Sequence, residues 1–284
     1  MRFAIESVSP VNQAEMIEFL KMRENFSLFL LSNFENYGPK LSDEPYSGNY
    51  KLIRSTKDVV GVFCLTRRGS LLIESLITYP IFEQILASCK IEPIPLKGLV
   101  GNWMFCEPFW GYLKDQRVIQ QETFFSKEIL YAIDLSLMNT SSNFSVNFFT
   151  ESDFSEWKKI QFDYIKEKKL PNELTEAQLF KQFQNMVQNK IAWGIKINNH
   201  LVSIALLNAK AFDLGQVGGV YTKPKYRRKG YSKAVLQQLF YDCQHHHQMR
   251  KLVIFTDDKN SIVKNLYVKL GARPVGYFSL LFGE

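Results

Sequence analysis

Residues 218–232 read GGVYTKPKYRRKGYS, and this stretch decides the fold. It ends an extended run, 215–222, and opens a stretch with helical periodicity, 232–245. A turn between a strand and a helix directs backbone N–H groups and the positive helix end toward one point, which suits an anion. Gly230 lets the backbone approach a phosphate closely. Cations fill residues 223–229: Lys223, Lys225, Arg227, Arg228 and Lys229.

Other phosphate-binding motifs are missing from the sequence. The pattern G-x-x-x-x-G-K-[ST] does not occur, and no G-x-G-x-x-G follows a predicted strand. On the residues alone, a solvated basic turn remains an alternative. A nucleic-acid surface is another, because Tyr221, Tyr226 and Tyr231 alternate with the cations. Nucleic-acid sites usually have a broader basic face, so nucleic acid is the less expected partner.

The whole chain has the composition of a globular protein, with 284 residues, 46% hydrophobic residues and a net charge of +7. The charge favours an anionic partner. Glu6 lies where a signal peptide needs an apolar run, and no apolar stretch approaches the roughly 20 residues that span a bilayer. We therefore expect a cytoplasmic protein with no membrane partner. Irregular spacing predicts buried free thiols at Cys64, Cys89, Cys106 and Cys243.

Hydrophobic periodicity divides the chain into two similar halves. The first predicts helices within 12–34, strands at 50–53, 59–66 and 71–75, helices near 81–88 and 102–113, and an extended run at 124–135. The polar segment 139–143 is the expected linker. The second predicts a strand at 144–149, helices to about 168 and from about 173 to 188, a hairpin at 191–209, and a strand at 215–222. After these we expect a helix at 232–245, a strand at 251–255, a helix at 261–270 and an extended tail at 272–282. Crossover helices between strands predict a mixed α/β sheet.

Two motifs carry a resemblance to a known family. Gly218–Thr222 ends a strand as G-G-V-Y-T, and Arg227–Ser232 matches a phosphate loop of the form [RQ]-x-x-G-x-[AG] except at Ser232. Downstream, Asn260 precedes a helix that delivers Tyr267 and ends near Gly271. Residues 215–283 thereby resemble the GNAT acetyltransferase superfamily, in particular its glycine-N-acyltransferase-like branch.

The resemblance implies a role for each matched position. Backbone groups of Val220, Tyr221 and Thr222 would hydrogen-bond the pantetheine arm of acetyl-CoA as an added strand. Asn260 would contact the pantetheine or cap the next helix. Tyr267 would donate a proton or hydrogen bond to the departing sulfur, since a phenol with a reference pKa of about 10 stays protonated at neutral pH. The pyrophosphate would be held by Arg227, Arg228, Lys229, Gly230, Tyr231 and Ser232.

The general base has no sequence signal. Asp213, Asp257 and Asp258 lie near predicted strand ends, but nothing selects one of them. We expect direct transfer through a tetrahedral intermediate, because Cys243 lies away from the motifs and no base neighbours it in sequence. The run His245–His247 is expected to be a solvated helix end, because consecutive helical residues diverge by about 100°. No metal site is predicted.

The expected fold is α/β (α+β), with two GNAT-like domains, each a mixed twisted sheet flanked by helices. Residues 1–140 would form a degenerate domain that shapes the acceptor cleft, and residues 144–284 the catalytic domain that binds acetyl-CoA. The expected function is acetyl transfer from acetyl-CoA to an amine. Transfer of a longer acyl group to an amino acid such as glycine, an acyl-CoA sensor and a basic nucleic-acid-binding module are alternatives. The acceptor and the oligomeric state are open.

Overall fold

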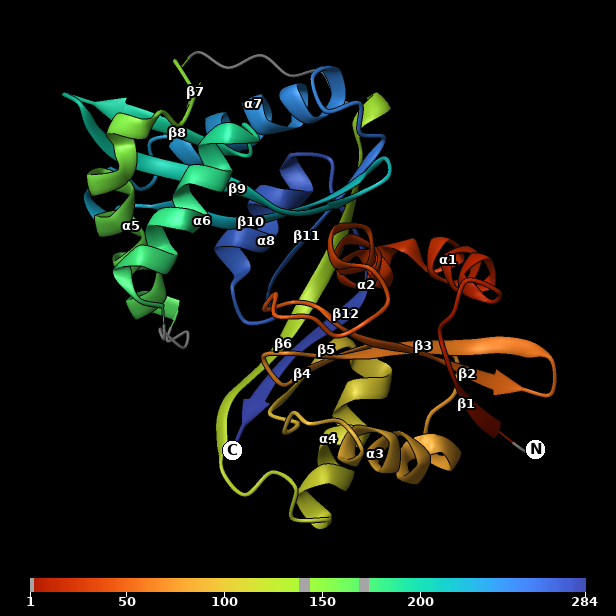
Figure 1. The fold of residues 1–284 in the computed structure, drawn as a ribbon. Helices are drawn as coiled ribbons and strands as arrows, with labels where there is room; N and C mark the ends of the chain where they lie inside the picture. Colours follow the sequence, from red (N-terminus) through yellow and green to blue (C-terminus); the bar gives the residue numbers. More distant parts are fainter. Residues whose placement is uncertain (1–2, 138–143, 169–173) are drawn as a thin grey trace. The chain divides into compact units, whose positions relative to one another are not determined.

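The computed structural model describes residues 3–137, 144–168 and 174–284 (Figure 1). The expected linker, 139–143, lies outside these residues. Contacts divide the chain into two compact units. Unit 1 contains residues 1–131, 255–261 and 274–284, and unit 2 contains residues 132–254 and 262–273. The C-terminal strand therefore packs with the first half of the chain.

The first half of the chain alternates helices and strands from β1 to β6. Its strands are β1 (Phe3–Ser7), β2 (Gly48–Ser55), β3 (Asp58–Thr66), β4 (Ser70–Ser75), β5 (Gly98–Asn102) and β6 (Glu122–Asp134). Its helices are α1 (Gln13–Met22), α2 (Glu24–Tyr37), α3 (Phe82–Lys90) and α4 (Trp103–Asp115), with short 3₁₀ turns η1 (Tyr79–Ile81) and η2 (Leu135–Leu137). Strand β6 carries the chain from unit 1 into unit 2.

The second half repeats this order of elements. Its strands are β7 (Asn147–Phe148), β8 (Ala192–Ile197), β9 (His200–Ala211), β10 (Leu214–Thr222), β11 (Lys251–Asp257) and β12 (Arg273–Gly283). Its helices are α5 (Phe154–Lys168), α6 (Glu176–Gln188), α7 (Tyr231–His245) and α8 (Ser261–Lys269), with η3 (Glu151–Asp153) and η4 (Pro224–Tyr226). Each half thus runs strand, two helices, three strands, helix, strand, helix, strand.

Unit 1 is a mixed sheet between two helical layers. Its strand order is β1-β2-β3-β4-β5-β12, with β4 and β5 parallel and the other pairs antiparallel. Helices α3 and α4 cover one face, where Phe63 and Trp110 belong to the buried core. Helix α2 covers the other face, where the buried Tyr50 hydroxyl donates to the Leu30 carbonyl at 2.6 Å. Figure 1 shows these layers.

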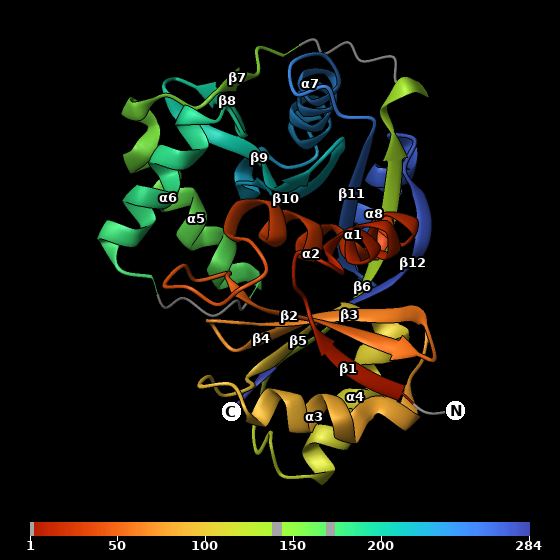
Figure 2. The same ribbon diagram turned by 45° about the vertical axis from the view of Figure 1, so that its right-hand side comes forward.

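Unit 2 has the same layering, which Figure 2 shows from a second side. Its strand order is β11-β10-β9-β8-β7, and only the β10–β11 pair among these is parallel. Ala192 packs into the core that Trp157 of α5 and Phe183 of α6 build on one face. The next residue, Trp193, points to the opposite face, where its Nε1 donates to Asp242 of α7 at 2.7 Å. The predicted mixed α/β architecture is confirmed.

Strand β5 is the main element that the sequence did not predict. Residues 98–102 read GLVGN, and two glycines in five residues weaken a strand signal. The structure explains both glycines by close packing. A Cβ at Gly98 would collide with Phe282, and a Cβ at Gly101 would collide with the Ile73 carbonyl. The strand is buried over its whole length.

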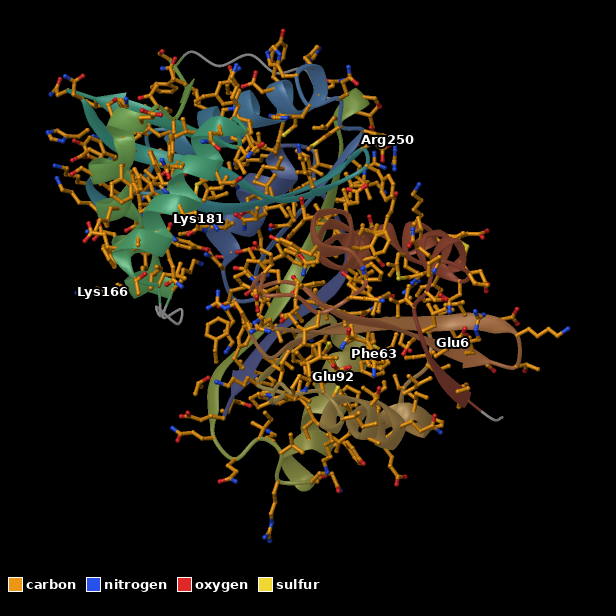
Figure 3. The ribbon with its side chains drawn as sticks, viewed as in Figure 1. Glu6, Phe63, Glu92, Lys166, Lys181 and Arg250 are labelled. Carbon is orange, nitrogen blue, oxygen red and sulfur yellow. The ribbon has the colours of Figure 1, made fainter. Side chains whose placement is uncertain are left out.

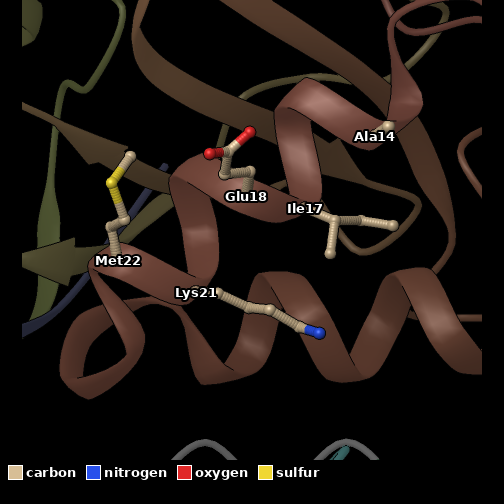
Figure 4. Close-up of a pocket in the computed structure, with 5 residues that line it drawn as sticks. All are labelled: Ala14, Ile17, Glu18, Lys21 and Met22. Atoms are coloured by element: carbon tan, nitrogen blue, oxygen red, sulfur yellow. The ribbon is translucent and has the colours of Figure 1, made fainter.

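A surface pocket of about 560 Å³ lies on α1 in unit 1 (Figure 4). It is lined by Ala14, Ile17, Glu18, Lys21 and Met22, none of which belongs to the predicted coenzyme residues. Within residues 3–137, 144–168 and 174–284, no helix has both the length and the apolar character needed to cross a membrane. The predicted free thiols are confirmed, because all cysteines are buried and unpaired.

Candidate functional site

Strands β10 and β11 separate midway along β10. Their parallel pairing runs from Leu214/Lys251 to Val217/Ile254 and ends there. At the same point β10 slips by one residue against β9 between Gly218 and Tyr221, and Gly219 adopts a left-handed φ of +57°. Such a bulge bends the strand and increases its twist. Residues 218–222 therefore continue along β9 after their pairing with β11 has ended.

The backbone groups of this segment alternate in direction. The Lys223 amide donates to the Val202 carbonyl at 3.0 Å, and Tyr221 is two residues before it in the same register. In an antiparallel ladder, groups two residues apart face the same neighbour. Tyr221 therefore bonds β9, whereas the backbone groups of Val220 and Thr222 face the side where β11 has left. This side can accept an extended ligand.

The loop after β10 turns sharply into α7. Arg228 and Gly230 have left-handed φ angles of +62° and +86°, and Gly230 is the N-cap. Within the described part of the chain no side chain caps α7, whose first turn holds no acidic residue, and the first helical bond is Ala234 N–H to the Gly230 carbonyl. The amides of the first turn point out of the helix end with the positive end of the helix dipole. This arrangement suits an anion.

The cations of the loop have different surroundings. Arg227 Nε donates to the Thr222 carbonyl at 2.9 Å, its Nη2 bonds Glu167 of α5 at 2.6 Å, and its guanidinium lies 5.4 Å from the centre of the Tyr221 ring. Lys225 and Lys229 lie exposed beside the Tyr226 ring. The Arg227 side chain is thus held by unit 2 itself, whereas Lys225 and Lys229 stay exposed beside the backbone amides of the loop.

Ser232 makes a contact that alanine or glycine could not make. Its Oγ lies 2.7 Å from Thr222 Oγ1, which lies 2.7 Å from Ser203 Oγ of β9. The departure from the loop pattern at Ser232 therefore connects the first turn of α7 with β10 and β9.

Tyr267 lies in unit 2 with the loop, and Asn260 is grouped with unit 1. Tyr267 is only 4% exposed, so its ring packs into the protein. The Asn260 amide donates to the Asp257 carbonyl at 2.9 Å in the turn ahead of α8. The loop and Tyr267 therefore belong to the same unit.

Asp213 lies at the opposite end of β10 from the loop. Nine residues of strand separate them, which is roughly 30 Å at about 3.3 Å per residue. Arg250 Nε bonds Asp213 at 2.9 Å. Glu167 contacts Arg227 of the loop, so its neighbour Lys166 shows where the loop lies in Figure 3. Arg250, the partner of Asp213, lies far from Lys166 in that view. Asp213 is therefore too distant to act as a base beside the loop. Asp257 Oδ1 accepts the Lys259 amide at 2.8 Å.

Glu156 of α5 is a charged residue beside β10 that sequence reasoning missed. It lies 2.9 Å from Lys159, 3.3 Å from His200 and 3.6 Å from Lys223, the residue directly after β10. The hydrogen bond from Lys159 is the main cause that lowers the pKa of Glu156. A lowered pKa makes a weak base, so Glu156 is better suited to hold Lys223 than to remove a proton. The sequence could have pointed to Glu156, because it lies in the first turn of α5, directly after the capping residues that begin at Thr150.

The three histidines at the end of α7 contact three different groups. His245 bonds the Tyr241 carbonyl at 2.9 Å, His246 lies 3.5 Å from Asp242, and His247 bonds the Lys190 carbonyl at 3.2 Å. Their ring nitrogens therefore do not converge on one point.

Unit 1 has a charged side chain where its own parallel strands separate. Strands β4 and β5 pair from Ser70/Gly98 to Ile73/Gly101, as β10 and β11 do over four residues. The next residue is Gly218 in β10 and Glu74 in β4. Glu74 is fully buried and its Oε1 lies 2.7 Å from Arg23 Nη2. An ion pair therefore lies where unit 2 has glycine.

Burial raises the pKa of Glu74 to about 7, against the hydrogen bond from Arg23. Because this pKa is higher in the folded than in the unfolded chain, its contribution to stability is full at low pH and is lost as the pH rises through about 7. Between about pH 5 and about pH 8, we expect the free energy of unfolding to fall by on the order of 2 kcal/mol more in the parent than in Glu74→Gln. Chemical denaturation at a series of pH values measures this change in the free energy of unfolding. Glu83→Gln, at an exposed position, should keep the parent's dependence of stability on pH. The same pH dependence in the parent and both variants would contradict the raised pKa of Glu74.

Comparison with known proteins agrees with this geometry. Residues 152–272 match the model of the acetyltransferase (GNAT) family. A search of curated protein sequences gives no match. Among solved structures, a Drosophila protein aligns with a TM-score of 0.71 at 13% identity, over 99% of this chain and 98% of its own.

Two further solved structures are of GNAT proteins. A GNAT-family acetyltransferase from Colwellia psychrerythraea aligns with a TM-score of 0.54 at 14% identity, over 99% of this chain and 100% of its own. A tandem GNAT protein of the clavulanic acid biosynthesis pathway aligns with a TM-score of 0.53 at 10% identity, over 99% and 98%. These identities show a shared fold, consistent with two GNAT-like domains. The family match covers residues 152–272, which include β10, the loop and α7.

Proposed function

We propose that residues 144–284 form the catalytic domain of an N-acetyltransferase that moves an acetyl group from acetyl-CoA directly to an amine. The observation that carries this proposal is the separation of β10 from β11 just ahead of the uncapped N-terminus of α7. The first feature suits a flexible arm with amide groups, and the second suits a pyrophosphate. Both lie within the residues that match the family model.

Each part of this site has one task in the proposal. Val220 and Thr222 offer backbone groups to the pantetheine arm, and Tyr221 holds this segment against β9. The amides of residues 227–232 bind the pyrophosphate, while the Arg227 side chain stiffens the loop through Glu167. Tyr267 donates to the departing sulfur. Asn260 contacts the pantetheine arm or caps the turn ahead of α8, where its backbone N–H donates to the Asp257 carbonyl.

We further propose that residues 1–140 form a degenerate GNAT-like domain that binds no coenzyme and determines the acceptor, as in the glycine-N-acyltransferase-like branch. The Glu74–Arg23 pair supports this, because buried side chains stand where β4 and β5 separate, whereas β10 has Gly218 at the matching position. The coenzyme should therefore bind with a stoichiometry of one per chain.

The test is thiol release from acetyl-CoA in the presence of a panel of amines, amino acids, aminoglycosides and peptides. We expect release that depends on one amine class and a product heavier by one acetyl group in mass spectrometry. Parallel reactions with longer acyl-CoA esters and glycine test the longer-acyl alternative. Coenzyme binding without turnover on any amine would favour an acyl-CoA sensor, and absence of binding would contradict the proposal.

A further inference from the structure

A lysine ammonium lies against two aromatic rings in unit 1. Lys127 Nζ of β6 is 4.1 Å from the centre of the Tyr277 ring of β12 and 5.1 Å from the centre of the Trp103 ring, at the start of α4. Phe125, two residues before Lys127, packs edge-on against Trp103 with the ring centres 5.7 Å apart. All four residues belong to unit 1. Three elements thus bring one cation and three rings together.

This Lys127 cluster, which consists of Lys127, Trp103, Phe125 and Tyr277, reaches the surface. Phe125 is 46% exposed and Tyr277 is 40% exposed, while Trp103 and Lys127 are partly buried. Met104, the neighbour of Trp103 in sequence, is 74% exposed. The rings therefore leave apolar area in contact with water beside a cation, and a ligand can reach both from solvent.

The Lys127 ammonium has no carboxylate partner among the residues that the structure describes, and its side-chain contacts are the two rings. Asp258 contacts only the backbone here, where its amide donates to the Lys127 carbonyl at 3.2 Å. An ammonium has three N–H donors, and contact with ring faces leaves donors for an anion. Within the same described residues, the Trp103 indole N–H and the Tyr277 hydroxyl also lack a hydrogen-bond partner.

These features suit a carboxylate that is attached to an aromatic group. The ammonium can donate a charge-assisted hydrogen bond to one carboxylate oxygen, and the Trp103 and Tyr277 donors stand beside it. The exposed Phe125 ring can pair with an aromatic body, edge-to-face or offset. A cationic ligand is disfavoured, because Lys127 already occupies the ring faces. A phosphate is also disfavoured, since phosphate sites favour arginine forks or cradles of backbone amides and this cluster offers one ammonium.

We propose that the Lys127 cluster is a binding site for a small aryl-substituted carboxylate. Lys127 pairs with the carboxylate, and Phe125 and Tyr277 contact the aromatic body. The site goes beyond the proposed acetyl transfer, because none of its residues belongs to the predicted coenzyme site.

The test is protection of Trp103 from acrylamide quenching by 3-phenylpropionate at constant ionic strength. Trp110 is 1% exposed and Trp157 and Trp193 are 0% exposed, so quenching of tryptophan fluorescence reports on Trp103. From the affinity that a ligand of this size gains, we expect half-protection at about a few millimolar. Acetate lacks the ring and 3-phenylpropan-1-ol lacks the charge, so each should need a concentration at least about fivefold higher.

Variants of the cluster separate its charge from its rings. Lys127→Met keeps the aliphatic stem beside the rings and should raise the half-protection concentration about fivefold, as for loss of a partly exposed ion pair. Lys127→Arg keeps a cation that stacks on aromatic rings and should stay within about twofold of the parent. Phe125→Ala should weaken protection by 3-phenylpropionate roughly threefold and leave protection by acetate unchanged. Lys90→Met, which removes an exposed lysine of α3 in the same unit, is the matched control and should behave as the parent.

The outcomes decide between the parts of the proposal. Equal protection in Lys127→Met and the parent would overturn the pairing of Lys127 with a carboxylate, as would equal protection by the alcohol and by 3-phenylpropionate. Absence of protection in the parent at concentrations well above the millimolar range would overturn the whole site. Neither result bears on the coenzyme site, because the assay contains no coenzyme.

Discussion

A Gly230→Glu variant is expected to lose coenzyme A binding, with Kd rising by more than about 100-fold. Gly230 has a φ of +86° and forms the N-cap of α7, so a side chain here begins at the mouth of the anion site. A glutamate adds a negative charge where the amides of α7 should meet the pyrophosphate, and like charges brought together cost several kcal/mol. Calorimetric titration measures the loss.

Gly230→Ala is the matched control for backbone strain. A Cβ at Gly230 would meet only the Phe144 ring, at 3.7 Å, so space is not limiting. A left-handed residue other than glycine costs about 1–2 kcal/mol, and both variants incur that cost. We therefore expect similar melting temperatures and a much smaller loss of affinity in Gly230→Ala. Equal affinity in Gly230→Glu and the parent would disprove the phosphate loop.

The sequence was sufficient for the strand, loop and helix of residues 214–245, because local signals agree there. The apolar run of β10, the glycine at the N-cap and the periodicity of α7 each depend on nearby residues. The turn at Asn198–Asn199 was predictable for the same reason, and both residues have left-handed φ angles. Strand β5 was not predictable, because its glycines are explained only by Phe282 and Ile73, which are distant in sequence.

Side-chain partners could not be predicted from the sequence either, because they too are distant along the chain. The cations of the loop all add charge in a composition count, but the structure directs Arg227 to Glu167, 60 residues away. Glu74 carries no signal as a buried charge until Arg23 is beside it. Asp213 looked equivalent to Asp257 in sequence, although strand direction puts it at the wrong end of β10. The roles of Tyr267 and Asn260 stay predictions.

A Tyr267→Phe variant should lower turnover by about 10²- to 10⁴-fold and leave coenzyme affinity nearly unchanged. The departing sulfur needs a proton or hydrogen bond donor, and a phenol remains protonated at neutral pH. Tyr267 is 4% exposed, and phenylalanine keeps its ring in the core. The variant therefore removes the donor and little packing. Steady-state rates with saturating acetyl-CoA, together with calorimetric Kd, measure the two effects separately.

Tyr241→Phe provides the matched control, because Tyr241 is 41% exposed on α7 and stacks on His245 away from the loop. It should keep the turnover of the parent. A Tyr267→Phe variant with unchanged turnover would remove Tyr267 from the mechanism. A variant with weaker coenzyme binding and unchanged turnover would assign Tyr267 to binding instead, since a donor to the leaving sulfur acts mainly in the transition state. Loss of turnover at constant Kd is the result that only a proton donor predicts.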